Sequence, residues 1–236
     1  MRAYSTSKDL LLRRVFDKCV IEDAVKASEK WIAVSDGTGG VFADKWSRYL
    51  LDNLPDEPIT TYEAFDKWLD GIGEPFYNKY EEIAKKGGGM LLNKFYDEGS
   101  FATLVVVWRD GHWLSYGDSV AFCYNKSTGK LQHTFGKIVD FNNPPYLINC
   151  KDATDESAFK SGRFHLNDSD VVFAASDALA YYIIMMYELA HKDWYGEDLL
   201  TAINAQTKNS ILIRTAMAMR KIDFNNRLHY CPVKVD

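Results

Sequence analysis

The sequence predicts an α+β domain in which antiparallel β-sheets and helices form separate layers. Runs with β-strand composition and runs with helical periodicity occur in blocks along the 236 residues, rather than alternating one by one. The strand runs are separated by short turn signals such as residues 109–111, Arg-Asp-Gly, which are typical of antiparallel neighbours. No internal repeat or linker composition divides the chain, so we expect residues 1–236 to form one domain.

The chain is expected to begin with a β-hairpin that leads into a helix. Residues around 19–22 and 31–35 are rich in β-forming side chains and flank a charged turn. Glycines in residues 37–40 then predict a tight turn, because glycine tolerates positive φ and close approach of the backbone. Apolar residues recur at helical spacing from about Val41 to Leu54, which predicts a helix there.

A second helical region and a block of strands are expected next. Thr61 is a candidate N-cap, the helix is expected to be interrupted near residues 71–75, and the glycines at 87–89 are expected to end it. Residues 101–135 contain β-rich runs joined by turns, which predict a β-meander. An irregular connection should then lead to further strand in residues 163–176.

The C-terminal part is expected to be mainly helical. A strongly apolar helix should follow Asp177 and should be largely buried. A longer helix is expected from about Glu197 to Arg220, and residues 227–235 are expected to form a last strand.

Composition excludes several classes of partner and site. The net charge is −5 and no basic patch is evident, so we expect no nucleic-acid partner. No run resembles a signal peptide or a membrane span, so we expect a cytoplasmic protein without a membrane partner. The four cysteines are far apart, which argues against a zinc site and favours reduced, buried thiols.

Three aspartates occupy similar places in the sequence. Asp36, Asp118 and Asp177 each lie at or near the end of a β-rich run beside small residues. Each one alone could be a turn former or a helix cap. Together, and with Asp177 flanked by apolar residues at the expected rim of the core, they predict a cation site, because a buried anion must be paired. Mg²⁺ and Mn²⁺ favour such oxygen ligands.

The motifs around these aspartates resemble those of the type 2C, or PPM-type, metal-dependent serine/threonine protein phosphatases. The text AVSDGTGGVFADKWSRYLLDNL is similar to the family's Asp-Gly-x-Gly-Gly element and the helix after it. The text EGSFATLVVVWRDGHWLSYGDSVAF resembles its Gly-Ser-Thr strand and Gly-Asp-Ser turn, and DSDVVFAASDALAYYI resembles its Asp-x-hydrophobic-Ser-Asp-Gly element. The resemblance implies a four-layer α-β-β-α sandwich of two antiparallel sheets flanked by helices.

The resemblance also implies roles for individual residues. Asp36 would be the catalytic centre's bridging ligand between two Mn²⁺ or Mg²⁺ ions, Gly37 would offer its main-chain carbonyl to one ion, and Asp177 would bind the other. Asp118 would hold a third, weaker ion or orient water on the metal. Two adjacent dications would activate a water for attack on a phosphomonoester of a phosphoprotein.

The ends of the chain depart from the family pattern. Asp17 matches the last position of the family's Asn-Glu-Asp, and the phosphate-binding arginine would be Arg13 or Arg14. Near the C-terminus, Asn225 stands where the family has a metal-binding aspartate, unless Asp223 takes that role. Two hypotheses follow: a metal-dependent phosphoprotein phosphatase, and a catalytically weak or inactive phosphatase-like module that binds or regulates a partner.

Overall fold

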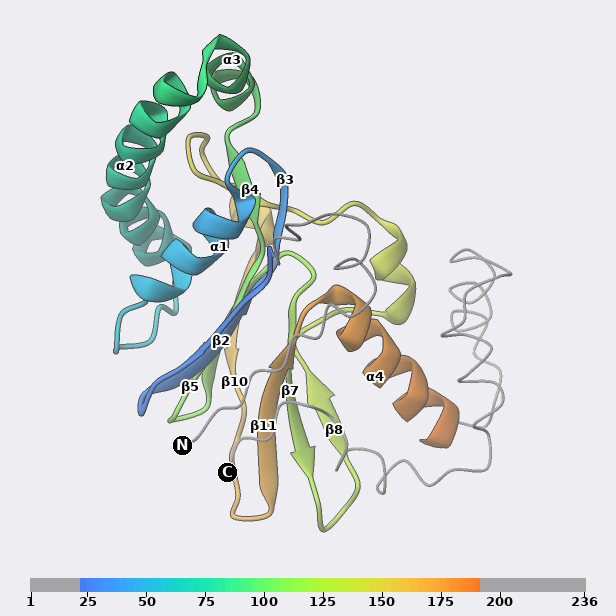
Figure 1. Cartoon of the computed structure of the whole chain (residues 1–236). Coiled ribbons are helices and arrows are strands. Elements are labelled where there is room, and N and C mark those ends of the chain that lie inside the picture. Colours follow the sequence, from blue (N-terminus) through green and yellow to red (C-terminus); the bar gives the residue numbers. More distant parts are fainter. Residues whose placement is uncertain (1–21, 192–236) are drawn as a thin grey trace.

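Two antiparallel sheets lie face to face in the computed structural model, which describes residues 22–191 (Figure 1). The first sheet has the strand order β1-β2-β5-β6-β10, with β1 (Ala24–Ala27), β2 (Trp31–Ser35), β5 (Leu104–Trp108), β6 (His112–Tyr116) and β10 (Phe159–Arg163). The second sheet has the order β11-β7-β8, with β7 (Val120–Asn125), β8 (Leu131–His133) and β11 (Asp170–Ala175). All pairs within both sheets are antiparallel.

Alternation along the strands accounts for this face-to-face packing. In β2, Ile32 and Val34 belong to the core between the two sheets, whereas Trp31 and Ala33 belong to the core under the helices. Successive side chains of a strand point to opposite faces, so a strand that is buried on both faces must be apolar throughout. Val105 and Val107 of β5 follow the same rule and meet residues of β7 and β11 in the inner core.

Helices cover both outer faces. The first sheet carries α1 (Ala43–Asp52), α2 (Tyr62–Gly87) and α3 (Gly89–Glu98), and its outer core is rich in aromatic rings such as Trp46, Phe65 and Phe76. The second sheet carries α4 (Asp177–His191) and the 3₁₀ turn η2 (Ile138–Asn142), while η3 (Glu156–Ala158) precedes β10. Figure 1 shows α1, α2 and α3 on one side of the strands and α4 on the other. The expected four-layer α-β-β-α sandwich is confirmed.

A third, small sheet was not expected. It has the order β3-β4-β9 and is formed by β3 (Gly37–Gly40), β4 (Ser100–Ala102) and β9 (Ile148–Asn149). The glycine segment that the sequence assigns to a turn is therefore a short, irregular strand, with a register shift between Gly37 and Gly40. Four residues, three of which are glycine, are too few to show the two-residue alternation by which a strand is recognised in a sequence.

The strand that pairs with β2 is β1, Ala24–Ala27, which lies closer to β2 than the expected run at 19–22, of which only residue 22 is described. The turn at Ser28 is closed by a hydrogen bond from its N–H to the Trp31 carbonyl at 2.8 Å. A turn that short fixes the register of the hairpin. Ala24 is thereby paired with Ser35 and Ala27 with Ile32.

The expected break in the second helix is wrong. α2 runs without interruption from Tyr62 to Gly87 and contains Pro75, and Thr61 caps it as expected. Its buried face, which includes Phe65, Leu69 and Phe76, packs on the first sheet, and this packing outweighs the local cost of glycine and proline. The glycines at 87–89 end α2 and also start α3, a helix that the sequence analysis did not predict.

Two expectations for the strands are corrected. Residues 101–135 contain the expected strands but no single meander, because β5 and β6 belong to the first sheet and β7 and β8 to the second. The connection expected to be irregular contains β9 and also β10, which pairs with β6 in the first sheet.

Two expected helices are confirmed. The helix predicted at 41–54 is α1, and the apolar helix after Asp177 is α4, with Ile183, Ile184 and Met185 buried. Cys123 and Cys150 are free, buried thiols. Within residues 22–191 no helix is long and apolar enough to cross a membrane. The helix expected at 197–220 and the last strand lie outside the described residues.

Candidate metal centre

Strand register brings four aspartates to one end of the sandwich. Asp36 directly follows β2, and because Ala24 pairs with Ser35, Asp23 lies just before β1 beside it. Asp118 lies in the connection from β6 to β7. Asp177 starts α4 directly after β11, whose last residue, Ala175, pairs with Val120 at the start of β7. Antiparallel pairing thus gathers segments that are far apart in the chain.

The Asp36 carboxyl is the most perturbed group of the cluster. Burial raises its pKa to about 8, helped by a hydrogen bond with the Asp23 carboxyl and by the charges of Asp23, Asp177 and Asp118. All of these effects disfavour the carboxylate. In the described part of the chain, every charged group that shifts the Asp36 pKa is an acid. Within residues 22–191, the charges that shift the pKa of Asp36 therefore leave the cluster without a compensating cation.

Asp118 belongs to the same cluster. Its pKa is raised to about 6, first by burial and then by the charge of Asp177, while its own backbone N–H acts in the opposite direction. Asp36 and Asp118 are both partly buried, so their mutual repulsion is only partly screened by solvent. A dication between them would remove the repulsion, and carboxylate oxygens are the donors that Mg²⁺ and Mn²⁺ prefer. The donor set therefore fits such an ion.

Asp177 differs from its expected environment. Its side chain is exposed instead of lying at the rim of the core, and its Oδ1 accepts a hydrogen bond from the Ala178 N–H at 2.6 Å. The apolar residues that flank it in sequence turn into the core of the second sheet, because Asp177 is the first residue of α4 and projects from its N-terminal turn. Its charge nonetheless reaches both Asp36 and Asp118.

The carboxylates do not form a finished metal site. Within residues 22–191, no group of three or more His, Cys, Asp or Glu side chains has its donor atoms placed as a metal would require. The Asp36 carboxyl instead faces the Asp23 carboxyl, and burial together with this contact raises the pKa of Asp36 to about 8. A bound ion would therefore compete with a proton on Asp36 and would require the side chains to turn toward a common point.

Gly37 shows why the segment after Asp36 needs glycine. A Cβ atom at Gly37 would lie 2.5 Å from the Ala43 carbonyl oxygen and 2.8 Å from the Glu22 carbonyl oxygen. Both are main-chain atoms that cannot move independently of α1 and of the segment before β1. Gly39 and Gly40 adopt positive φ angles of 70° and 69°. In this structure, the atoms that leave no room for a side chain at Gly37 are thus the main-chain carbonyls of Ala43 and Glu22.

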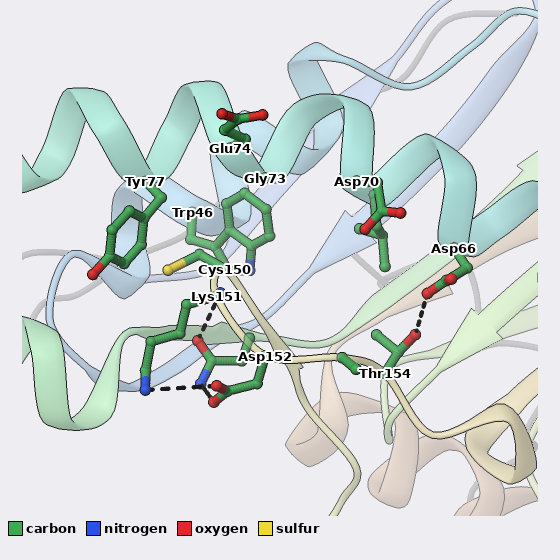
Figure 2. Close-up of a pocket in the computed structure, with 13 residues that line it drawn as sticks. Trp46, Asp66, Asp70, Gly73, Glu74, Tyr77, Cys150, Lys151, Asp152 and Thr154 are labelled. Carbon is green, nitrogen blue, oxygen red and sulfur yellow. Dashed lines mark hydrogen bonds and ion pairs between the residues drawn. The ribbon is translucent and has the colours of Figure 1, made fainter.

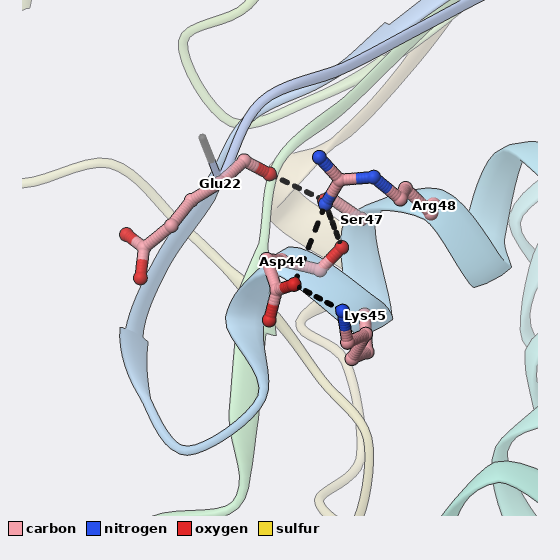
Figure 3. A network of polar contacts seen from close by, with 5 residues as sticks. All are labelled: Glu22, Asp44, Lys45, Ser47 and Arg48. Carbon is pink, nitrogen blue, oxygen red and sulfur yellow. Dashed lines mark hydrogen bonds and ion pairs between the residues drawn. The ribbon is translucent and has the colours of Figure 1, made fainter. Parts of the chain in front are cut away.

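Helix α1 also holds the segment that carries Asp23. The buried Ser47 hydroxyl donates to the Glu22 carbonyl oxygen at 2.5 Å (Figure 3). In the same view, Asp44 in the first turn of α1 forms ion pairs with Lys45 at 2.7 Å and with Arg48 at 3.7 Å. Asp23 therefore follows a residue whose main chain is fixed from α1, opposite Asp36.

Asp23 is the functional candidate that the sequence analysis missed. The Glu22-Asp23 pair stands directly before the first strand, so it was a signal in the sequence. The sequence analysis matched the family's Asn-Glu-Asp to Asp17 instead, and Asp17 lies outside the described residues. Of the other expected site residues, Asp36, Gly37, Asp118 and Asp177 lie at one end of the sandwich. The remaining five lie outside the described residues: Arg13, Arg14, Asp17, Asp223 and Asn225.

A separate hollow lies between α2 and the segment 149–154. It has a volume of about 630 Å³, with Trp46 and Cys150 among its lining residues (Figure 2). Acidic side chains of α2 line one wall, namely Asp66, Asp70 and Glu74. None of the four clustered aspartates lines this hollow, so it is a different feature from the candidate metal centre.

No protein-family model matches the sequence, and no curated protein matches it. Among solved structures, the fold is similar to three phosphatases. The catalytic domain of the serine/threonine phosphatase PstP with two manganese ions has 14% identity and a TM-score of 0.49, covering 84% of this chain and 87% of that one. The Mycobacterium tuberculosis phosphatase PstP/Ppp has 15% identity and a TM-score of 0.47, covering 84% and 86%. The Mycobacterium smegmatis phosphatase MsPP with cacodylate has 14% identity and a TM-score of 0.43, covering 83% and 84%.

Proposed function

We propose that this protein is a divergent PPM-type phosphatase that hydrolyses phosphoserine or phosphothreonine monoesters of a phosphoprotein with the help of Mn²⁺ or Mg²⁺. One observation carries the proposal. Four aspartates from four separate segments meet at one end of an α-β-β-α sandwich, and in the described part of the chain only acids shift the pKa of the central one, Asp36. Such a cluster is stable in its charged form only with a bound cation.

The residues present suggest how two ions would be held. Asp36, the Gly37 carbonyl, Asp23 and Asp177 would hold them, and Asp118 would add a further carboxylate beside them. When bound, the ions supply positive charge to the phosphoryl group and lower the pKa of a water molecule. The sequence has no Cys-x5-Arg motif and no Gly-x-Ser-x-Gly motif, so neither of these familiar protein nucleophiles is expected.

The chain's own part in the reaction is to gather and fix negative charge. Burial of Asp36 among three other acids raises its pKa to about 8, so metal binding at Asp36 would compete with a proton on that carboxyl. The main chain on either side of the cluster is tied to the sheet and to α1, which keeps the carboxylates close in spite of their repulsion. Substrate would approach from the solvent side, where Asp177 is exposed.

The direct test is Mn²⁺-dependent hydrolysis of a phosphoserine peptide by the wild-type chain and by Asp36→Ala. We expect the variant to lose at least about 100-fold in rate, since even outer-shell partners of metal ligands are worth 10–100-fold. The variant should stay folded, because the substitution removes an acid that is buried among like charges. Asp70→Ala, which removes an exposed aspartate from α2, is the matched control and should keep the wild-type rate.

A second candidate function is a phosphatase-like module that binds a partner without turnover. The absence of a finished set of metal donors in residues 22–191 and the exposed position of Asp177 favour it. The same experiment separates the two. A wild-type chain that binds Mn²⁺ and phosphopeptide but releases no phosphate would support the module, and equal rates for wild type and Asp36→Ala would place any activity elsewhere.

A further inference from the structure

We propose that Thr103 and Ser119 form a positioning pair that fixes the separation of Asp36 and Asp118 for metal binding. The inference rests on the proposed function, because it concerns how the same cluster receives an ion. Thr103 lies between β4 and β5, and Ser119 lies between Asp118 and β7. The pair therefore joins the two sheets directly beneath the aspartates.

Thr103 holds the main chain at Asp36 from two sides. The Asp36 N–H donates to Thr103 Oγ1 at 3.2 Å, and the Thr103 N–H donates to the Asp36 carbonyl oxygen at 2.8 Å. The Ser35 hydroxyl donates to the Thr103 carbonyl oxygen at 2.7 Å. Every polar group of Thr103 is thus engaged near Asp36, and the backbone from which the Asp36 carboxyl projects cannot shift without breaking these bonds.

The same threonine contacts both residues that flank Asp118. Its Oγ1 lies 2.6 Å from the Ser119 Oγ, a hydrogen bond between two hydroxyls. Its methyl carbon lies so close to Gly117 that a Cβ there would be 2.7 Å from it. Asp118 is therefore held on one side by a hydrogen bond and on the other by close packing, and both come from Thr103.

Burial makes this link stiff. Thr103 is 1% exposed and Ser119 is fully buried, so water does not compete for their hydrogen bond. The Ser115 hydroxyl also donates to the Ser119 carbonyl oxygen at 3.4 Å. Since Asp36 follows a strand of the first sheet and Asp118 leads into the second, the bond between the two hydroxyls sets how far apart the two carboxylates lie.

The test measures Mn²⁺ affinity by calorimetry, with MnCl₂ as the only ligand, at a temperature where circular dichroism shows every variant folded. Thr103→Val keeps the shape and the methyl contact but removes the hydroxyl, and Ser119→Ala removes its partner. We expect each to weaken Mn²⁺ binding about 10-fold, the lower end of the range for partners of metal ligands. Thr103→Ser keeps the hydroxyl and should bind within about threefold of wild type.

Thr134→Val is the matched control. Thr134 is also buried, and its Oγ1 also accepts a backbone hydrogen bond, from the Ala121 N–H at 3.0 Å. This hydrogen bond involves neither Gly117 nor Ser119. Thr134→Val should lose thermal stability as Thr103→Val does while keeping wild-type Mn²⁺ affinity. The double variant Thr103→Val/Ser119→Ala should bind Mn²⁺ about as weakly as Thr103→Val alone, because Thr103→Val already removes the hydrogen bond that Ser119→Ala removes.

Three outcomes would overturn the inference, and they can be told apart. Wild-type affinity in Thr103→Val, or an equal loss in Thr134→Val, would show that the pair serves stability alone. A wild-type chain that binds no Mn²⁺ would overturn the proposed function and this inference with it. Peptide-level hydrogen exchange in the metal-free protein gives a further check, since the Asp36 amide should exchange faster in Thr103→Val and not in Thr134→Val.

Discussion

Replacement of Gly37 by alanine tests whether the glycine segment is needed for close backbone approach. The added methyl would lie 2.5 Å from the Ala43 carbonyl oxygen and 2.8 Å from the Glu22 carbonyl oxygen. Real Cβ contacts are not that short, so α1 must move away from the segment that precedes Asp23. Gly37→Ala should therefore both destabilise the fold and disturb the metal centre.

The expected magnitude follows from these two contacts. Overpacking against rigid neighbours costs about 1–3 kcal/mol, and two main-chain clashes place Gly37→Ala at the upper end, about 3 kcal/mol. For a chain of this size that corresponds to a melting temperature lower by about 6–12 °C. Gly71→Ala is the matched control, because Gly71 lies inside α2 with no atom within 4 Å of its added Cβ. It should raise stability by about 1 kcal/mol, the helix preference of alanine over glycine.

Both variants are measured by thermal unfolding of the metal-free protein, followed by Mn²⁺ titration at a temperature where each is folded. We expect opposite shifts in melting temperature and weaker Mn²⁺ binding for Gly37→Ala alone. A Gly37→Ala protein that melts and binds Mn²⁺ like wild type would refute the reasoning, since α1 and the Glu22 carbonyl could then move apart without consequence.

Two further predictions concern charge at the same site. The pKa of Asp36 in the fold is about 8, above its ordinary value of 3.8, so the folded metal-free protein binds more protons than the unfolded chain between these two pH values. Its melting temperature should therefore fall as pH rises from about 4 to 8, and saturating Mn²⁺ should abolish this dependence. A melting temperature that does not change with pH in the absence of metal would contradict the burial of Asp36 among acids. Asn225 lies outside the described residues, and the prediction for it rests on the sequence: Asn225→Asp should tighten Mn²⁺ binding in calorimetry by restoring an anion, whereas unchanged affinity would mean that Asp223 or another residue serves at that position.

The layers of the fold could be predicted from the sequence because they depend on periodicity over many residues. Strands such as β5, with five apolar residues in a row, and helices such as α1 carry patterns that survive errors at single positions. Elements whose sequence signals are short or contradictory were predicted wrongly. Pro75 and its neighbouring glycines indicated a break in α2, but the sheet beneath Phe65 and Phe76 supplies packing energy that local preference does not include. The four residues of β3 are likewise too few to show a strand period.

The candidate site was predicted where its residues sit beside long elements, and missed where it depends on register. Asp36, Asp118 and Asp177 follow or precede strands and a helix that periodicity identifies. Asp23 depends on the exact start of β1, which is set by the pairing of Ala24 with Ser35 across a tight turn. The sequence analysis matched the motif to Asp17, which lies outside the described residues, and did not consider Asp23, because periodicity does not locate the start of a four-residue strand.

Glycine at position 37 is explained both by the proposed metal centre and by helix packing, and the sequence alone does not separate these two explanations. A metal that binds the Gly37 carbonyl and a helix that packs on the Gly37 α-carbon both call for a residue without a side chain. The structure supplies the second reason directly, through the Ala43 and Glu22 carbonyl oxygens. Ser47 then fastens the same Glu22 carbonyl to α1, so the helix, the glycine and the segment carrying Asp23 form one packed unit. A substitution that loosens this unit should therefore weaken metal binding even though it touches no carboxylate.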